Sequence, residues 1–283
     1  MSKSMNIGIL GLGLIGGSLG FDLRDQGHHV IGVSRQESTC EQAVTLGNVD
    51  EASTDMSHLK SAEVIFICTP LGLIVPILKQ LITHLPSTTI ITDVGSVKTP
   101  VVKTATSLWN NFVGGHPMAG TAESGITAAK RKLFKDNPYV FTPVDTTVND
   151  ALKTVENLAS QLGANIHHCS PEVHDKAVSW ISHLPVMVSA SLLHACMNEN
   201  NNAVVELAQK LASSGFRDTS RVGGGNPELG VMMAKYNRQE LLTSLKEYRY
   251  NLGYLIDLIE GEDWESLQQQ LQLAQKVRPA FTE

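Results

Sequence analysis

Short runs of almost uniformly apolar residues recur through the first part of the chain. They lie at residues 6–10, 29–33, 63–68, 89–93, 112–115, 139–142 and 165–169, and helical periodicities fill most of the intervals between them. Strands that are apolar on both faces are typical of parallel sheets with helices packed on each side. The pattern therefore predicts an α/β domain built on a mostly parallel sheet.

The pattern changes after Cys169, where the strand signal ends. Ser170 and Pro171 have the residue types of a helix N-cap and a first-turn proline, and helical periodicity continues from there. We therefore expect two domains, an α/β domain at residues 1–169 and an all-helical domain at residues 170–283.

One segment of the helical domain carries a long apolar stripe. Its apolar residues recur in alternating steps of four and three, which places them on one helix face: Leu241, Leu245, Tyr248, Leu252, Leu255 and Ile259. Such a stripe packs either into the core of its own chain or against a helix of a second subunit. The pattern alone leaves both interpretations open.

Composition and charge narrow the class of protein. A length of 283 residues with 42% hydrophobic content favours two domains that share a cleft. The net charge of −6, without a basic run, argues against a nucleic-acid partner. The four cysteines are widely separated and show no Cys-x-x-Cys spacing, which indicates a reducing compartment, so we expect a cytoplasmic protein.

No membrane partner is expected. The apolar tract 64–78 is short and is interrupted by prolines and a glycine, so it does not read as a membrane span. The apolar run near the N-terminus lacks a signal-peptide cleavage pattern and leads into charged residues.

Glycines follow the first predicted strand at the spacing of a dinucleotide-binding loop. Gly11, Gly13 and Gly16 stand between that strand and a helix that opens at Leu14 and Ile15. In this motif the first glycine permits the turn, the second lets the backbone approach a pyrophosphate, and the third lets helix and strand pack closely. The helix N-terminus then offers free N–H groups to the anion. The pattern predicts a Rossmann-type cofactor domain.

The residues after the second strand indicate which dinucleotide binds. NAD-selective sites place an acid there, but Ser34 and Arg35 occupy these positions and the first acid is Glu37. A hydroxyl and a guanidinium suit the 2′-phosphate of NADP, which a carboxylate would repel. Thr69 and Pro70 follow the next predicted strand and are expected at the same sheet edge, beside the cofactor. We predict NADP as the cofactor.

Polar residues near the ends of later strands are candidates for chemistry. Ser96 lies in the loop after the strand 89–93, at the carboxyl edge of the sheet where ligands bind, although it could equally be a helix cap. His116 directly follows the strand 112–115 and should lie near the nicotinamide. Imidazole titrates near neutrality and can accept a proton as hydride departs, and neighbouring glycines would leave its ring accessible. A histidine bonded to a loop carbonyl is the structural alternative. Asp93 is interpreted as a capping or turn residue.

The helical domain contributes further candidates. His183 precedes a proline on an apolar helix and is either a core histidine or a substrate contact. Arg217 and Arg221 stand close to several glycines between helices, which is a reasonable place to receive carboxylates.

A metal site is not expected. Four residues invite the idea: His167, His168, Cys169 and His174. The adjacent histidines, however, point to opposite sides of a strand, and no second ligand group stands at zinc-like spacing.

Five separated motifs together resemble one enzyme family. In chain order they read GLGLIGGS, DVGSVK, GGHPMAGT, SHLP and FRDTSR, and the resemblance covers nearly the whole chain. They resemble the prephenate/arogenate dehydrogenases of tyrosine biosynthesis, most of all the compact arogenate dehydrogenases of cyanobacterial type. The resemblance implies a Rossmann-type domain followed by a helical dimerisation domain, hence a homodimer. It also implies NADP-dependent oxidative decarboxylation of arogenate to tyrosine.

The resemblance also implies roles for individual residues. His116 matches the residue that accepts the proton of the substrate hydroxyl, and Ser96 matches a serine that orients histidine, hydroxyl and nicotinamide. The remaining matches are a second active-site histidine, a carboxylate-binding arginine, a further substrate contact and a weaker candidate: His183, Arg221, Thr121 and Arg217.

Other functions remain open at this stage. A preference for prephenate would give 4-hydroxyphenylpyruvate instead of tyrosine. A β-hydroxyacid dehydrogenase shares the glycine motif and a helical second domain, but it generally relies on a lysine with no clear counterpart near SHLP. A non-catalytic NADP sensor would have no need of His116 beside Ser96.

Overall fold

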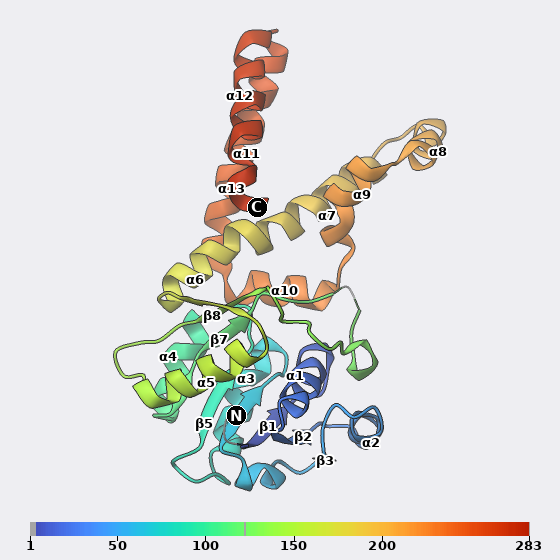
Figure 1. Ribbon diagram of the computed structural model, residues 1–283. Coiled ribbons are helices and arrows are strands. Elements are labelled where there is room, and N and C mark those ends of the chain that lie inside the picture. The colour runs from blue at the N-terminus through green and yellow to red at the C-terminus, as the bar shows by residue number, and fades with distance from the viewer. Residues whose placement is uncertain (1–3, 122, 283) are drawn as a thin grey trace. The chain divides into compact units, whose positions relative to one another are not determined.

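Among the described residues, six strands form a parallel sheet in the order β3-β2-β1-β4-β5-β6 (Figure 1). The computed structural model describes residues 4–121 and 123–282. The strands are β1 (Asn6–Leu10), β2 (His29–Val33), β3 (Glu51–Ser53), β4 (Val64–Ile67), β5 (Ile90–Asp93) and β6 (Phe112–Val113). The predicted mostly parallel sheet is confirmed, and β3 is a strand that the apolar pattern did not indicate.

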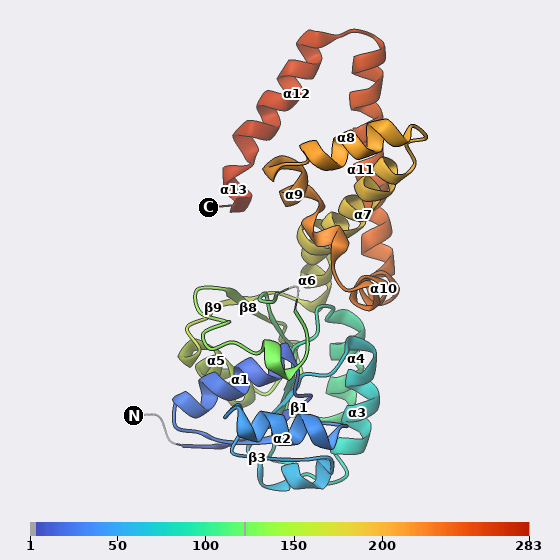
Figure 2. The ribbon, with the colours of Figure 1, turned by 90° about the vertical axis from the view of Figure 1, so that its right-hand side faces the viewer.

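Helices cover both faces of this sheet, with α1 and α5 on one side and α3 and α4 on the other (Figure 2). Alternate residues of β4 divide between the two cores, Val64 and Phe66 on one face and Ile65 and Ile67 on the other. Burial on both faces explains why these strands are apolar throughout. The helical elements here are α1 (Leu14–Asp25), α2 (Glu37–Thr45), η1 (Met56–Ser61), η2 (Leu71–Leu73), α3 (Ile74–Leu81), α4 (Thr99–Leu108), η3 (Ile126–Ala128) and α5 (Asn149–Gln161).

A second, smaller sheet follows, in the order β7-β8-β9. Its strands are β7 (Gly115–Pro117), β8 (Pro138–Phe141) and β9 (Asn165–His168); β7 and β8 are antiparallel, and β8 and β9 are parallel. The single strand predicted at 112–115 is therefore wrong, because the chain leaves the main sheet at Gly114. A Cβ there would lie 2.5 Å from the side chains of Thr142 and Val102, so only glycine fits at this crossing.

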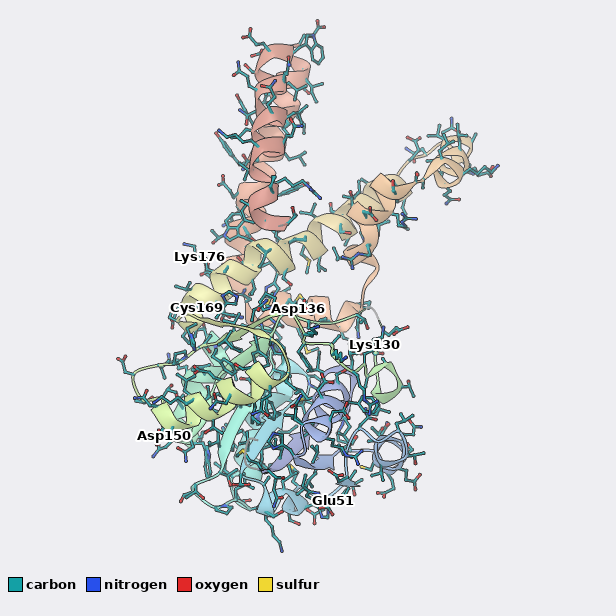
Figure 3. All side chains as sticks on the ribbon, in the orientation of Figure 1. Glu51, Lys130, Asp136, Asp150, Cys169 and Lys176 are labelled. Atoms are coloured by element: carbon teal, nitrogen blue, oxygen red, sulfur yellow. The ribbon has the colours of Figure 1, made fainter. Side chains whose placement is uncertain are left out.

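After β9 every described element is helical, as expected. Ser170 caps α6 by accepting a hydrogen bond from the Val173 N–H, which confirms the predicted helix start. Figure 3 labels Cys169, just ahead of α6, and Lys176 within it. The elements are α6 (Pro171–Val178), a π-helical turn η4 (Ser179–His183), α7 (Leu184–Met197), α8 (Asn202–Leu211), α9 (Ser214–Ser220), η5 (Arg221–Gly224), α10 (Pro227–Tyr236), α11 (Arg238–Glu260), α12 (Trp264–Val277) and α13 (Pro279–Thr282).

The helices α6 and α7 form one continuous stretch through the π-helical turn. Pro185 follows this turn, and the wider turn suits a residue that has no N–H to donate to the preceding turn. By length and composition alone, the stretch 171–197 is the one described helix that could cross a membrane. Its first part, however, is tied to the α/β fold, since Asp175 accepts hydrogen bonds from the Lys98 and Thr99 amides.

The chain separates into two compact units at Asn237. The first unit includes both sheets and the helices α1 to α10, and the second includes α11, α12 and α13. The predicted domain boundary near residue 170 coincides with the change from strands to helices and stays a prediction.

Candidate active site

The glycine loop has the shape that a dinucleotide requires. Gly11 has a φ of +107°, and a Cβ on it would lie 2.7 Å from the Cys68 backbone. A Cβ on Gly16 would lie 2.0 Å from the Gly11 carbonyl oxygen, so helix and loop approach as closely as glycine allows. Gly13, in contrast, has no neighbouring atom within 4 Å of its Cβ position. The α1 N-terminus has no capping side chain, which leaves its N–H groups for an anion.

Further groups around this loop fit a bound cofactor. Ser34 and Arg35 directly follow β2, and the exposed Arg35 side chain makes no hydrogen bond or ion pair with any described residue. The Thr69 hydroxyl is buried without a hydrogen-bond partner, which is costly unless a ligand supplies one. Pro70 comes next and begins the short turn of η2.

His116 lies within β7 and is not placed directly after a strand of the main sheet, as the apolar pattern had indicated. The residue is buried, with 8% of its surface exposed. A Cβ on the preceding Gly115 would lie 2.9 Å from the Asp93 carbonyl oxygen. The glycines before His116 therefore serve close packing between the two sheets, and not access of ligands to the ring.

An ion pair is buried directly beneath β7. Lys98 and Asp93 both have fully buried side chains, and the Lys98 ammonium bonds the Asp93 carboxylate and, at 2.6 Å, the Gly115 carbonyl oxygen. The Asp93 carboxylate also accepts hydrogen bonds from the Gly95 and Gly115 amides, at 2.8 and 3.3 Å. Asp93 is thus more than the predicted capping or turn residue, because with Lys98 it fixes the strand that carries His116.

A row of hydrogen bonds leads from His116 into α6. His116 Nδ1 lies 2.8 Å from His174 Nε2, and His174 Nδ1 lies 2.8 Å from Asp175 Oδ1. The two rings meet edge to face, with centroids 5.0 Å apart. The sequence pattern suggested His174 only as a metal ligand and gave no signal for Asp175, because neither residue belongs to a local motif.

His183 belongs to the same cluster. It ends the π-helical turn and is fully buried, and its Nδ1 lies 3.1 Å from the amide nitrogen of Asn237, which also donates to the Asp175 carbonyl at 2.7 Å. An amide nitrogen can only donate, so Nδ1 of His183 accepts and Nε2 carries the proton. That Nε2 is buried without a partner among the described residues.

Burial keeps both histidines of the predicted site neutral. Burial lowers the pKa of His116 well below its ordinary value, and the electrostatic influence of His174, Lys98 and His183 lowers this pKa further. Burial also lowers the pKa of His183 to about 4, although Asp175 opposes the shift. Near neutral pH, His116 is therefore a proton acceptor and His183 a neutral donor.

The other predicted site residues lie at the surface or half-buried. Ser96 is half-buried in the loop between β5 and α4, and Thr121 is exposed and accepts a hydrogen bond from the Glu123 N–H. Arg217 is exposed on α9 beside Asp218, at 3.7 Å. Arg221 is exposed at the start of η5, which packs on α7, and it has no ion pair with any described residue. Among the described residues, no hydrogen bond or ion pair joins these four side chains to the buried histidine cluster.

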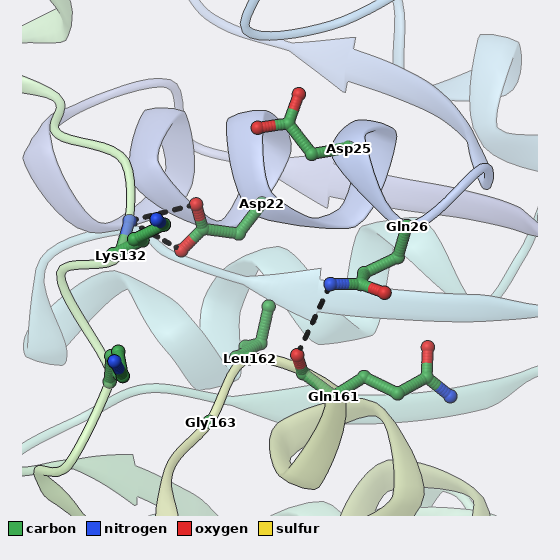
Figure 4. A pocket seen from close by; sticks show the side chains of 8 residues that line it. Asp22, Asp25, Gln26, Lys132, Gln161, Leu162 and Gly163 are labelled. Carbon is green, nitrogen blue, oxygen red and sulfur yellow. Dashed lines mark hydrogen bonds between the residues drawn. The ribbon is translucent and has the colours of Figure 1, made fainter.

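A hollow elsewhere in the fold does not include any predicted site residue. It lies where α1 and α5 end, and its lining residues are drawn in Figure 4: Asp22, Asp25, Gln26, Lys132, Lys135, Gln161, Leu162 and Gly163. Asp22 accepts from the Lys132 amide, and Gln26 bonds the Gln161 carbonyl oxygen. Within the described residues, no cluster of His, Cys, Asp and Glu could hold a metal ion.

Two family models together match most of the chain. Residues 19–168 match the nucleotide-binding domain of prephenate dehydrogenase, and residues 170–273 match its dimerization domain. The prephenate dehydrogenase of Bacillus subtilis is 33% identical over 277 residues, which are 95% of this chain and 74% of the relative.

Solved structures of enzymes agree with this match. The chain is 54% identical to the arogenate dehydrogenase of Synechocystis, with 98% of this chain and 100% of the other covered and a TM-score of 0.87. It is 28% identical to the prephenate dehydrogenase of Aquifex aeolicus, solved with hydroxyphenyl propionate and NAD+, with 99% of both chains covered and a TM-score of 0.92. With its nucleotide-binding sheet and its helical second part, the chain belongs to the prephenate dehydrogenase family of oxidoreductases, which use a nicotinamide cofactor.

Proposed function

We propose that this protein catalyses the NADP-dependent oxidative decarboxylation of arogenate to tyrosine, with His116 as the proton acceptor. The observation that carries the proposal is the buried His116 ring, kept neutral beside His174 and His183. The likeness to an arogenate dehydrogenase over the full chain supports arogenate as the substrate. Prephenate, with 4-hydroxyphenylpyruvate as product, is the second candidate, because the curated B. subtilis relative is a prephenate dehydrogenase.

The reaction balances with one hydride transferred and one carbon dioxide released, because the substrate reacts as a carboxylate. The hydroxyl proton that the base takes returns to the phenolate oxygen of the product. NADP+ held at the glycine loop would supply the hydride acceptor for the ring carbon that carries the hydroxyl. His116 takes the hydroxyl proton at Nε2, and the bond from the ring to the carboxylate breaks, so that its electron pair makes the ring aromatic. Aromatisation supplies much of the driving force, so the protein mainly has to align the groups and place a base.

The remaining predicted residues bind and orient. We assign Ser96 to orienting the hydroxyl and the nicotinamide, Arg221 to a substrate carboxylate, and Thr121, with Arg217 as a weaker candidate, to further contacts. His183 can donate its unpartnered Nε2–H to a substrate oxygen, which would satisfy a buried group that otherwise costs stability.

The proposed cofactor site is formed by residues that follow strands of the main sheet. The pyrophosphate would lie against Gly11, Gly13 and Gly16 at the start of α1, where Leu14 and Ile15 begin the helix. Thr69 and Pro70 would line the cofactor at the end of β4. We assign Ser34 and Arg35 to the 2′-phosphate, because a free exposed guanidinium suits a dianion and no acid competes beside it.

We also propose a cytoplasmic homodimer formed through the helical part, without a nucleic-acid or membrane partner. The match to a dimerization domain supports the dimer. Single-chain exposure of the apolar stripe on α11 supports it further, with Tyr248, Leu252 and Ile259 at 38%, 45% and 51%. The domain boundary near residue 170 remains part of this proposal.

The substrate is tested by steady-state kinetics with four pairs of reactants. Arogenate and prephenate are each combined with NADP and with NAD, and kcat/KM is compared. We expect the highest kcat/KM for arogenate with NADP. Higher values for prephenate would reverse the substrate assignment, and turnover of neither compound would remove the proposed function.

The role of His116 is tested by His116→Asn. We expect kcat to fall by about 10²-fold or more, the usual size of a general-base effect, while KM changes little. His84→Asn, a change at an exposed loop histidine, is the matched control. An unchanged kcat in His116→Asn would remove His116 from the chemistry.

A further inference from the structure

We propose that His174 and Asp175 act as a positioning pair that fixes the tautomer of His116 and leaves its Nε2 free to accept a proton. The inference rests on the proposed function of His116 as base. It arises from the unbroken row of hydrogen bonds from Asp175 through His174 to His116, in which both distances are 2.8 Å.

Asp175 is held as a carboxylate that can only accept. Its Oδ1 accepts from the Lys98 amide at 2.7 Å and its Oδ2 from the Thr99 amide at 2.8 Å, both at the N-terminus of α4. Burial alone would raise the pKa of Asp175, but the hydrogen bonds from His174 and these amides outweigh it and lower this pKa. The helix dipole also favours the anion.

The direction of every hydrogen bond in the row then follows. A carboxylate that only accepts requires His174 Nδ1 to carry a proton, which leaves Nε2 of a neutral His174 as an acceptor. His116 Nδ1 faces that acceptor at 2.8 Å and must therefore donate. A neutral His116 with its proton on Nδ1 has its lone pair on Nε2.

The row as proposed takes His174 as the neutral imidazole. The Lys98 ammonium is buried in the same cluster and is paired with Asp93. The groups that face His116 are thus His174, Lys98 and His183.

The row of hydrogen bonds also stabilises the charge that forms during the proton transfer to His116. When His116 takes a proton at Nε2, its ring becomes a cation, and the Asp175 carboxylate stabilises this cation through His174. A carboxylate that orients a catalytic histidine in a Ser-His-Asp triad acts in the same way. Because α6 supplies the pair and β7 supplies His116, the tautomer depends on how α6 packs against the small sheet.

The tautomer is measured directly by NMR of the protein with 15N-labelled histidine, at a pH about 1.5 units above the ordinary histidine value. The His116 ring signals are assigned by their loss in His116→Asn. We expect a protonated Nδ1 and an unprotonated Nε2 for His116. The opposite pattern, with the proton on Nε2, would overturn the proposal, and the only variant that has to fold for this result is His116→Asn.

Two substitutions at His174 test the functional consequence. His174→Leu removes the acceptor for His116 Nδ1–H, and we expect kcat to fall about 10²-fold with KM within about twofold. His174→Gln can place an amide oxygen near the former Nε2, and we expect it to recover at least about tenfold of that loss. A purely structural role predicts no such difference between the two variants.

The control is His84→Leu, and NADP affinity together with near-ultraviolet circular dichroism verifies folding. If His174→Leu keeps the kcat of the control, the positioning pair is wrong while the role of His116 stands. If His116→Asn also keeps full kcat, it is the proposed base that fails. If His174→Leu does not fold, the NMR result decides.

Discussion

The two glycines before His116 can be interpreted in two ways, as access for a ligand or as close packing of the backbone. In the sequence, His116 is a candidate because glycines surround it, and those glycines were expected to let ligands approach its ring. The structure gives Gly114 and Gly115 a packing role instead, since a Cβ on either would meet neighbouring atoms at 2.5 or 2.9 Å. The choice of His116 depends instead on its burial and on its hydrogen bond to His174.

The lowered pKa of His116 leads to a prediction about pH. The active form is the neutral ring, which is protonated as the pH falls through the lowered pKa. Activity should therefore persist below 6.5, the ordinary pKa of histidine, and decline only at more acidic pH. The measurement is kcat/KM with arogenate and NADP as a function of pH.

An acidic limb centred at or above the ordinary histidine value would contradict this prediction. His116→Asn serves as the control, because its residual activity should lack that limb. Substrate or cofactor ionisation would give the same limb in both proteins and is thereby recognised.

At the scale of elements, the end of β2 carries the two residues that we assign to the 2′-phosphate of the cofactor. Pattern and structure agree here, because β2 spans the predicted residues His29–Val33 and Ser34 and Arg35 follow it directly. The prediction of one strand at 112–115 was wrong, since β6 ends at Val113 and β7 begins at Gly115. An apolar run alone does not reveal that its two halves pair with different neighbours.

The cofactor preference is tested at the end of β2. Arg35→Ala removes the free guanidinium, and we expect the KM for NADP to rise about tenfold, the equivalent of one charge-assisted contact. The KM for NAD, which has no 2′-phosphate, should change by less than about twofold. Equal effects on both cofactors would contradict the assignment of Arg35 to the 2′-phosphate.

At the scale of the whole molecule, several apolar side chains of the helical part are exposed to solvent in the single chain. The stripe predicted at residues 241–259 lies on one helix, α11, of 23 residues. Apolar residues of α8 are exposed as well, with Val204, Leu207 and Leu211 at 48%, 55% and 70%. Exposed apolar area of this kind supports the proposed interface between subunits.

Charge on the stripe should separate the proposed dimer. Leu252→Glu places a carboxylate at a position that is 45% exposed in the single chain, and burial of that charge in an interface is costly. We expect a shift from dimer to monomer in sedimentation velocity. Leu46→Glu, at a position 47% exposed in the α/β part, is the matched control and should remain dimeric. A dimeric Leu252→Glu protein would place the interface elsewhere.

The sequence by itself determined the features that local patterns encode. The apolar strands, the glycine loop before α1, the Ser170 cap and the amphipathic α11 all follow from residues within one or two turns of each other. The buried network could not be obtained in this way. His116 and His174 lie 58 residues apart, and Asp175 and the Lys98 amide 77 apart, so no periodicity relates them. Only the packing of α6 against β7 and the start of α4 brings these groups together, because buried polar atoms must find partners wherever the fold provides them.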